Sequence, residues 1–199
     1  MLRKIIFSLL VSLLMSVSVF AQYSMEISAN YSWPLSTEFS ENYQNGYGGD
    51  MEIIYQFKES GFGMGVQFGL VGYRAKKAYE QDLADANPTI FVYDYKVNLY
   101  SFPLIVHAKY VFFRNSDFHV IPDIGIGIEF MEKKEKQIGT YTSDYNKHYS
   151  NEFTINPNLG ISYNIVDDIA AILKVGYHQT LGVYELSHID VNLGIVYKL

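Results

Sequence analysis

The chain ends on His188-Ile189-Asp190-Val191-Asn192-Leu193-Gly194-Ile195-Val196-Tyr197-Lys198-Leu199, and this stretch decides the fold. Ile, Val, Leu, Ile, Tyr and Leu occupy every second position, and the positions between them are mostly polar or small. A period of two predicts a β-strand with one apolar face. Such a strand is long for a soluble sheet, but its length suits a strand tilted across a hydrocarbon layer about 30 Å thick.

The same alternation recurs along the chain. It predicts seven further strands, over residues 23–33, 48–58, 62–70, 95–112, 118–130, 152–165 and 171–178. Their connections alternate between long and short, as in bacterial outer-membrane barrels, which have short periplasmic turns and longer outer loops. We therefore predict an all-β fold: an eight-stranded antiparallel transmembrane β-barrel, connected as an up-and-down meander. Both termini would lie in the periplasm, and side chains would fill the lumen.

Three local patterns refine this prediction. In the fourth predicted strand the apolar positions change parity at Tyr100-Ser101, which predicts a β-bulge. Residues 75–86 could form a short helix that Asn87-Pro88 would stop. The polar, tyrosine-rich residues 132–150 are interpreted as a long connection.

The first residues have the parts of a secretory signal peptide. Met1-Leu2-Arg3-Lys4 precedes an apolar run over residues 5–20, and Val19 and Ala21 supply small residues for cleavage. We predict a signal peptide over residues 1–21 and a barrel domain over residues 22–199. An uncleaved transmembrane anchor is the alternative, but the apolar run is short for that role.

Composition excludes some functions. The chain has no Cys, so neither disulfides nor thiolate metal sites are available. The formal net charge is −6, and loss of Arg3 and Lys4 with the signal would make it more negative. A negative charge disfavours nucleic acid as a partner.

Alternation alone would also fit a soluble barrel with its apolar face inside. The outer face of such a barrel would be rich in Lys and Glu, whereas the polar face here is largely Gly, Ser, Asn and Thr, which suits a narrow lumen. Aromatic residues of the apolar face gather in two groups. Tyr23, Phe57, Phe62, Phe112, Phe118, Tyr163 and Tyr197 adjoin the short turns, and Tyr31, Trp33, Tyr95, Phe130, Phe153 and Tyr177 lie towards the long connections. Two aromatic girdles around an apolar band predict a barrel that faces lipid.

Several motifs resemble those of a known family. These are Leu99-Tyr100-Ser101-Phe102-Pro103-Leu104, Asp123-Ile124-Gly125-Ile126-Gly127 and the signal ending Phe20-Ala21-Gln22. With them, nearly the whole mature chain resembles the outer-membrane β-barrel family of Bacteroidetes that includes PorT-like proteins. The resemblance implies a fold and a location, and an accessory role in a secretion or motility apparatus. It implies no shared catalytic residues.

Charged residues on the polar face are expected to meet inside the narrow lumen, where they must pair because isolated buried charge is costly. We predict a structural polar network that includes Glu26, Glu52, Asp123, Glu129, Lys174, His178, Asp190 and Lys198. His107, Lys109, His119 and His188 fall on the same face. Lys174 is expected to pair with Glu129 or Asp123. A proton- or ligand-coupled interior is the functional alternative.

Enzymatic and metal chemistry are weakly indicated. His178, His188 and Asp190 should lie near the outer mouth with Ser187 and Thr180, but no Gly-x-Ser-x-Gly nucleophile motif is present. The histidines are scattered and lack the spacing of a helical metal site. We predict no enzymatic activity, no cofactor and no metal, with an outer-membrane enzyme kept as a third hypothesis.

The long connections carry many tyrosines among Asn, Ser and Gly, a composition suited to adaptable recognition. These are Tyr43, Tyr47, Tyr79, Tyr141, Tyr145, Tyr149 and Tyr184. A solvated surface without a ligand is the alternative. The predicted function is therefore a structural or recognition role at the outer loops. The predicted partners are outer-membrane lipid, the barrel-assembly machinery during biogenesis and a protein or glycan ligand.

Overall fold

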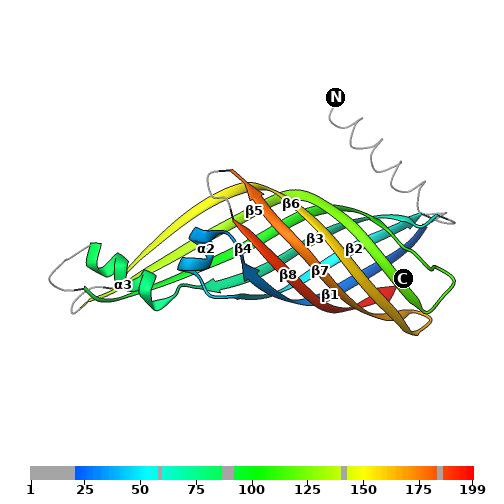
Figure 1. Cartoon of the computed structure of the whole chain (residues 1–199), viewed down its shortest axis with the longest axis horizontal. Helices are drawn as coiled ribbons and strands as arrows, with labels where there is room; N and C mark the ends of the chain where they lie inside the picture. Colours follow the sequence, from blue (N-terminus) through cyan, green and yellow to red (C-terminus); the bar gives the residue numbers. More distant parts are fainter. Residues whose placement is uncertain (1–20, 58–59, 87–91, 140–142, 183–185) are drawn as a thin grey trace, which may run out of the picture.

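Eight strands close into an antiparallel barrel (Figure 1). The computed structural model describes residues 21–57, 60–86, 92–139, 143–182 and 186–199. The strands are β1 (Ala21–Pro34), β2 (Gly46–Phe57), β3 (Phe62–Arg74), β4 (Val92–Tyr110), β5 (Phe118–Gly139), β6 (Ser143–Val166), β7 (Ile169–Leu181) and β8 (Ser187–Lys198). Each strand pairs with its neighbours in sequence, and β8 pairs with β1 to close the barrel. The predicted eight-stranded meander is confirmed. The predicted signal peptide lies almost wholly outside the described residues and stays a prediction.

The two ends of the barrel differ. The connections β2–β3, β4–β5 and β6–β7 are short and lie at one end, which also holds Ala21 and Lys198 at the ends of β1 and β8. We call this end the base. The other end, the mouth, carries the long connections β1–β2 and β3–β4, which hold the helices α2 (Thr37–Asn42) and α3 (Lys77–Ala86), together with the connections β5–β6 and β7–β8. The sequence predicted α3 but not α2. Within the described residues, no helix combines the length and apolar character needed to cross a membrane.

Strands β5 and β6 are longer than the sequence predicted. Residues 132–150, interpreted as a connection, mostly continue the two strands, which pair as far as Ile138 and Ser143. Figure 1 shows this hairpin and α3 extending past the rest of the barrel at the mouth. The interpretation was wrong because neither face of the hairpin is shielded by an apolar layer there. A strand without an apolar layer on either side needs no alternation of apolar and polar residues, so its sequence lacks the pattern that predicts a strand.

The predicted bulge at Tyr100-Ser101 is also wrong. The β4–β5 register runs unbroken from Asp94 to Lys109, and the one irregularity lies between Val92 and Asp94. The same face of β4 therefore points inward on both sides of the predicted slip. The apparent slip arises because the inner face changes from polar to apolar near the mouth. There the inward-facing residues are Tyr95, Val97 and Leu99.

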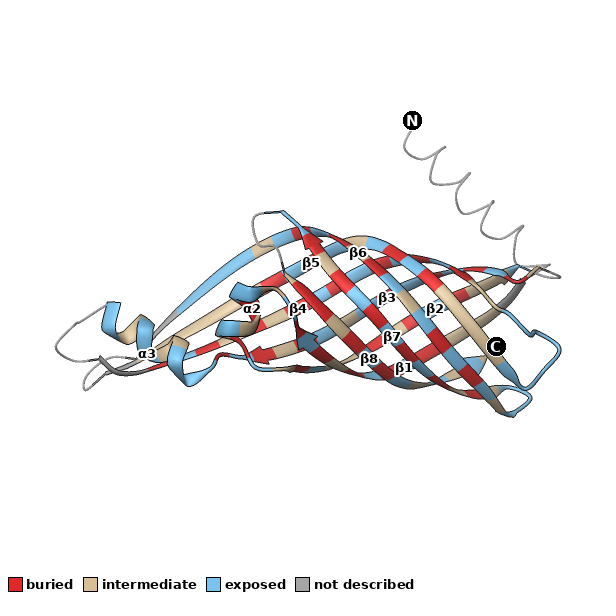
Figure 2. Cartoon of the chain, viewed as in Figure 1, coloured by how far each residue is buried: buried red, intermediate tan, exposed pale blue. Residues whose placement is uncertain are grey.

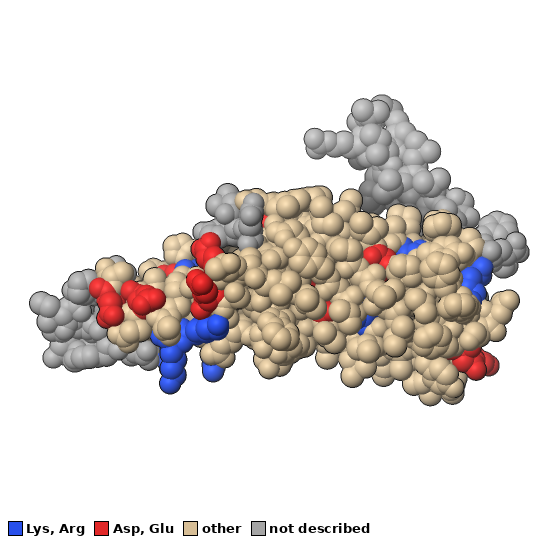
Figure 3. Space-filling model, viewed as in Figure 1, with Lys and Arg blue, Asp and Glu red and all other residues tan. Residues whose placement is uncertain are grey.

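The outer surface of the barrel carries an apolar band. Figure 2 shows buried and exposed residues alternating along the strands. The outward residues are apolar, for example Val106, Ile126 and Leu193, of which Ile126 is 54% exposed. Along the middle of the barrel the face drawn in Figure 3 is nearly free of charged side chains, which gather towards the two ends. So much exposed apolar surface on a single chain indicates contact with lipid or another apolar partner.

Aromatic residues border this band, with one correction. At the base, Phe62, Phe118 and Tyr163 are exposed, and at the mouth Trp33 and Phe130 are exposed. Tyr95 was expected in the mouth girdle, but it points inward and is only 3% exposed. The mistaken bulge placed it on the wrong face.

Candidate functional site

A layer of paired charges fills the half of the lumen nearer the base. Lys174 Nζ lies 2.5 Å from Glu26 Oε1 and 3.4 Å from Glu52 Oε2, and Lys109 Nζ lies 2.7 Å from Glu52 Oε1. All four side chains are almost fully buried. The expectation that Lys174 pairs with Glu129 or Asp123 is wrong. Its partners come from β1 and β2, which face β7 across the closed barrel.

Glycines on the inner face make room for these long side chains. A Cβ added to Gly65 would overlap the carboxylate of Glu52. A Cβ on Gly125 would lie 2.7 Å from the ring of His107, closer than side chains tolerate. The small residues on the polar face are therefore a packing requirement of the eight-stranded lumen.

The middle of the lumen is a hydrogen-bonded layer. His107 Nδ1 lies 3.0 Å from Asp123 Oδ1, and its Nε2 lies 2.7 Å from Gln67 Oε1. Asn158 donates to the same Asp123 oxygen at 2.7 Å. Beside this group, Asn30 joins Asp50 and Asn192, at 3.2 and 2.7 Å.

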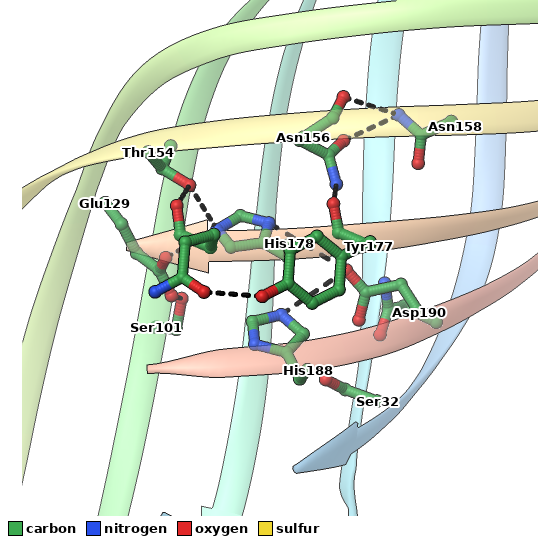
Figure 4. A network of polar contacts seen from close by, with 12 residues as sticks. Ser32, Ser101, Glu129, Thr154, Asn156, Asn158, Tyr177, His178, His188 and Asp190 are labelled. Atoms are coloured by element: carbon green, nitrogen blue, oxygen red, sulfur yellow. Dashed lines mark hydrogen bonds and ion pairs between the residues drawn. The ribbon is translucent and has the colours of Figure 1, made fainter. Parts of the chain in front are cut away.

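A histidine cluster lies nearer the mouth (Figure 4). His178 Nε2 lies 2.6 Å from Glu129 Oε2 and 2.6 Å from Thr154 Oγ1. Glu129 also accepts a hydrogen bond from Ser101. The rings of His178 and His188 stack with centroids 4.5 Å apart. We call His178, His188, Asp190 and Glu129 the histidine cluster.

Seven of the eight residues of the predicted network lie buried in the lumen: Glu26, Glu52, Asp123, Glu129, Lys174, His178 and Asp190. Lys198 does not join them. It lies at the base and donates to Asn164 Oδ1 at 3.2 Å and to the backbone oxygen of Asp167 at 3.0 Å. The sequence analysis did not include Ser101 and Thr154 in the network. Alternation places both residues inward, but the sequence alone does not show that their hydroxyls contact Glu129 and His178.

The packed lumen leaves little internal space in its middle. A cavity of about 10 Å³ lies among Asp50, Ser101, Glu129 and the histidine pair. That is about the space of one water. A larger cavity of about 240 Å³ is confined to the base, between Lys174 and Lys198 among others.

We therefore expect the protein to form no stable, large aqueous channel. Eight strands enclose only enough space for side chains, whereas open channels need sixteen or so. Single-channel recording in planar bilayers checks this expectation. The control is the same preparation after heat denaturation, to identify currents from contaminants. Reproducible porin-sized currents from the folded protein would contradict the expectation.

An apolar cluster closes the mouth of the lumen. It is made by Phe39, Tyr43, Val71, Tyr73, Ala75, Val97, Leu99 and Met131, and Tyr79, Leu83 and Leu186 pack against it. Phe39 comes from α2 and is 1% exposed. Its ring packs against Tyr73 at a centroid distance of 4.8 Å and lies 6.3 Å from His188. This apolar cluster therefore separates the histidine cluster from the exterior.

A pocket of about 390 Å³ opens above this apolar cluster. Phe39, Tyr43, Leu99 and Met131 line its floor region, and the pocket is completed by polar and aromatic groups from several elements. These are Glu38, Asn42, Tyr79, Lys133, Glu135, His148, Tyr149 and Ser150, and the aliphatic Leu186 also lines the pocket. We call it the mouth pocket. Its size and mixed lining are those of a binding site for a small group or a side chain.

One ion pair dominates the electrostatics of the mouth pocket. Lys133 Nζ lies 2.7 Å from Glu135 Oε1 and donates to Tyr79 Oη at 2.9 Å. Partial burial alone would lower the pKa of Lys133, but the bonds to Glu135 and Tyr79 outweigh it and raise that pKa well above its usual value. Lys133 is therefore held as a cation against an anion, and the wall it forms is close to neutral.

Among the described residues, the histidine cluster does not have a free hydroxyl placed for a hydrolase triad. His188 Nε2 lies 3.4 Å from Asp190 Oδ2, but both side chains are buried beneath the apolar cluster. Of the hydroxyls nearby, Ser32 Oγ is taken up by Tyr73 Oη at 2.6 Å, and Thr180 Oγ1 bonds the backbone of Leu186 at 2.7 Å. The adjoining 10 Å³ cavity is too small for an organic substrate.

The fold is that of the small outer-membrane β-barrel proteins. The chain is similar to a major outer membrane protein of Thermus thermophilus (TM-score 0.63, 12% identity) and to Ail of Yersinia pestis in complex with the heparin analogue sucrose octasulfate (0.59, 13%). It is also similar to Neisserial surface protein A (0.50, 14%). Each comparison covers 90% of this chain and 99% of the other. No family model and no curated protein matches the chain.

Proposed function

We propose that this protein is an integral protein of the bacterial outer membrane, exported by its signal peptide, with the base in the periplasm. The apolar band with its aromatic borders supports the membrane location, because a water-facing barrel would not expose it. The asymmetry of the connections supports the orientation. The base holds three short turns together with the first residue of β1 and the last residue of β8. This is the pattern of the periplasmic end of an outer-membrane barrel.

Cysteine labelling on intact cells tests the orientation. The chain has no native Cys. Glu41→Cys, exposed on α2 at the mouth, should react with a membrane-impermeant maleimide, whereas Ser116→Cys, exposed in the β4–β5 turn at the base, should react only after the outer membrane is permeabilised. The reverse labelling pattern would place the base outside the cell.

We infer further that the protein acts in recognition at the cell surface, and the mouth pocket is the observation that carries this inference. The barrel extends β4, β5, β6 and α3 beyond the apolar band, and the pocket lies among these elements and α2. A barrel that only spanned the membrane would need no strands that extend beyond the apolar band. Exposed tyrosines such as Tyr149 offer apolar rings and hydroxyls together, which suits contact with a protein or a sugar.

The charges that line the mouth pocket restrict the chemical class of ligand that it can bind. Ail, which shares this fold, was crystallised with a heparin analogue, sucrose octasulfate. Here Lys133 is paired with Glu135, and Glu38 also lines the pocket. A strongly anionic ligand would meet these carboxylates, so we propose a neutral glycan or an uncharged peptide segment.

Crosslinking in native membranes followed by identification of the captured partners tests this proposal, together with binding to a glycan array. Replacing Tyr79 and Tyr149 by Ala should reduce binding at least tenfold, since both rings line the pocket. Glu41→Ala, on the same helix as Phe39 but outside the pocket, is the matched control. Equal binding by the double variant and the control would contradict a role for the mouth pocket.

The resemblance to PorT-like proteins supplies the second candidate, an accessory role in a secretion or motility apparatus. The same crosslinking experiment separates the two. Capture of inner components of an export machine through the base would favour the accessory role, and capture of surface ligands through the mouth would favour recognition.

A further inference from the structure

The histidine cluster brings together three side-chain atoms of the kinds that bind metal ions. The ligating atoms of His178, His188 and Asp190 all lie within 4.8 Å of one another. His188 Nε2 is 3.4 Å and His178 Nδ1 is 3.9 Å from the same atom, Asp190 Oδ2. When four ligands surround zinc tetrahedrally with bonds of about 2.0–2.1 Å, neighbouring ligand atoms are about 3.3 Å apart. An imidazole nitrogen binds a metal in the plane of its ring, so one of the two stacked rings must rotate for all three atoms to reach bonding distance of one ion.

Glu129 orients one of these rings. Its Oε2 lies 2.6 Å from His178 Nε2, which leaves His178 Nδ1 on the side of Asp190 (Figure 4). Histidines that bind zinc commonly donate their other ring N–H to a carboxylate, which fixes the tautomer and makes the ligating nitrogen more basic. Glu129 is itself held by the hydroxyl of Ser101.

The cluster also has space and unused ligand capacity. The cavity of about 10 Å³ is lined by both histidines, Asp190 and Glu129. His188 Nδ1 and Asp190 Oδ1 are buried and find no hydrogen-bond partner among the described residues. Buried polar atoms in native proteins are nearly always paired, so these two atoms indicate a water in the cavity, whereas His188 Nε2 and Asp190 Oδ2 are the atoms that converge.

We propose that His178 Nδ1, His188 Nε2 and Asp190 Oδ2 bind one divalent transition-metal ion, with Glu129 as the positioning residue for His178. Two imidazoles and a carboxylate suit Zn²⁺, and a water in the cavity would supply the fourth ligand. The apolar cluster over the site and its small cavity favour a structural ion that ties β7 to β8 near the mouth. The proposal departs from the sequence prediction of no metal, which rested on the lack of a helical ligand spacing among scattered histidines.

Refolding with Co²⁺ tests the site, because Co²⁺ takes the same ligands and absorbs visibly when tetrahedral, whereas Zn²⁺ is silent. The full chain, unfolded in urea with a chelator and refolded into detergent with Co²⁺, should bind one ion with intense visible absorption that Zn²⁺ displaces. His188→Asn and Asp190→Asn should each abolish the absorption. Glu129→Gln should weaken Co²⁺ binding about 10- to 100-fold.

His148→Asn is the matched control, because His148 is an exposed histidine at the mouth outside the cluster, with its side chain 64% exposed. It should bind Co²⁺ like the unaltered chain, and heat-modifiable gel mobility confirms that each variant has folded. If neither cluster variant folds, the Co²⁺ stoichiometry and absorption spectrum of the unaltered chain test the proposal. Less than one ion bound, an octahedral spectrum, or full binding by a folded His188→Asn variant would overturn the proposal.

Discussion

Replacing Lys174 by Leu is expected to lower the free energy of unfolding by about 3–5 kcal/mol, the usual cost of removing one partner from a buried ion pair. The ammonium group lies between Glu26 and Glu52, at 2.5 and 3.4 Å. Leucine fills much of the space but removes the lysine that pairs with Glu26 and leaves Glu52 paired with Lys109. Equilibrium unfolding in urea, with the protein refolded into detergent, measures the change.

Lys198→Leu is the matched control for Lys174→Leu. Lys198 lies at the base, partly exposed, and its partners are a side-chain amide and a backbone carbonyl. Its loss should cost less than about 1 kcal/mol. Adding Glu26→Gln to Lys174→Leu should restore part of the lost stability. A Lys174→Leu variant as stable as the control would mean that water reaches this layer of the lumen.

Replacing Ile126 by Lys should lower the stability of the barrel in a lipid bilayer by about 2–4 kcal/mol, the cost of a lysine facing lipid near the midplane. Ile126 is exposed on the outer face of β5, two residues from the midpoint between Phe118 at the base and Phe130 at the mouth. Unfolding titrations in phospholipid vesicles measure this difference. Were this face in water, the substitution would change stability by no more than about 0.5 kcal/mol.

Tyr149→Lys is the control for the lipid-face substitution. Tyr149 is also an exposed residue on a strand of the same hairpin, but it lies beyond the apolar band. The added lysine should there be nearly neutral. Equal, small effects at Ile126 and Tyr149 would argue that lipid does not cover the band.

The strands could be predicted from sequence wherever one face meets an apolar layer and the other meets the lumen. Where that contrast ends, prediction failed. The β5–β6 hairpin beyond Phe130 has no apolar layer beside it, so its strands were interpreted as a loop. A second error was the β-bulge predicted in β4. The inner face of β4 is apolar near the mouth, at Tyr95 and Val97, and this apolar stretch was mistaken for a change of register.

The lumen residues could be predicted from alternation, but their partners could not. Lys174 on β7 meets Glu26 on β1 and Glu52 on β2 only because the barrel closes and brings distant strands face to face. His178 and Glu129 come from β7 and β5, the two strands that flank β6, and they meet because the sheet curves inward around the lumen. Helix α2 was missed because its six residues, five polar ones and Phe39, are too few to show a helical period.

The single tryptophan provides a native probe of the central claim, that lipid surrounds the apolar band. Trp33 lies on the outer face of β1 at the mouth border of the band and is 60% exposed. In water such a residue emits at long wavelength, whereas at a membrane interface its emission shifts to shorter wavelength. No substitution is needed, so the measurement is free of mutational effects.

The measurement is quenching of Trp33 fluorescence by lipids brominated at defined depths, with the protein folded into vesicles of those lipids. Our account predicts a blue-shifted emission that bromines placed near the headgroups quench more strongly than bromines near the bilayer centre, because Trp33 lies in the aromatic border. A folded, detergent-free soluble protein whose Trp33 emits as a water-exposed indole and is not quenched at any depth would contradict it.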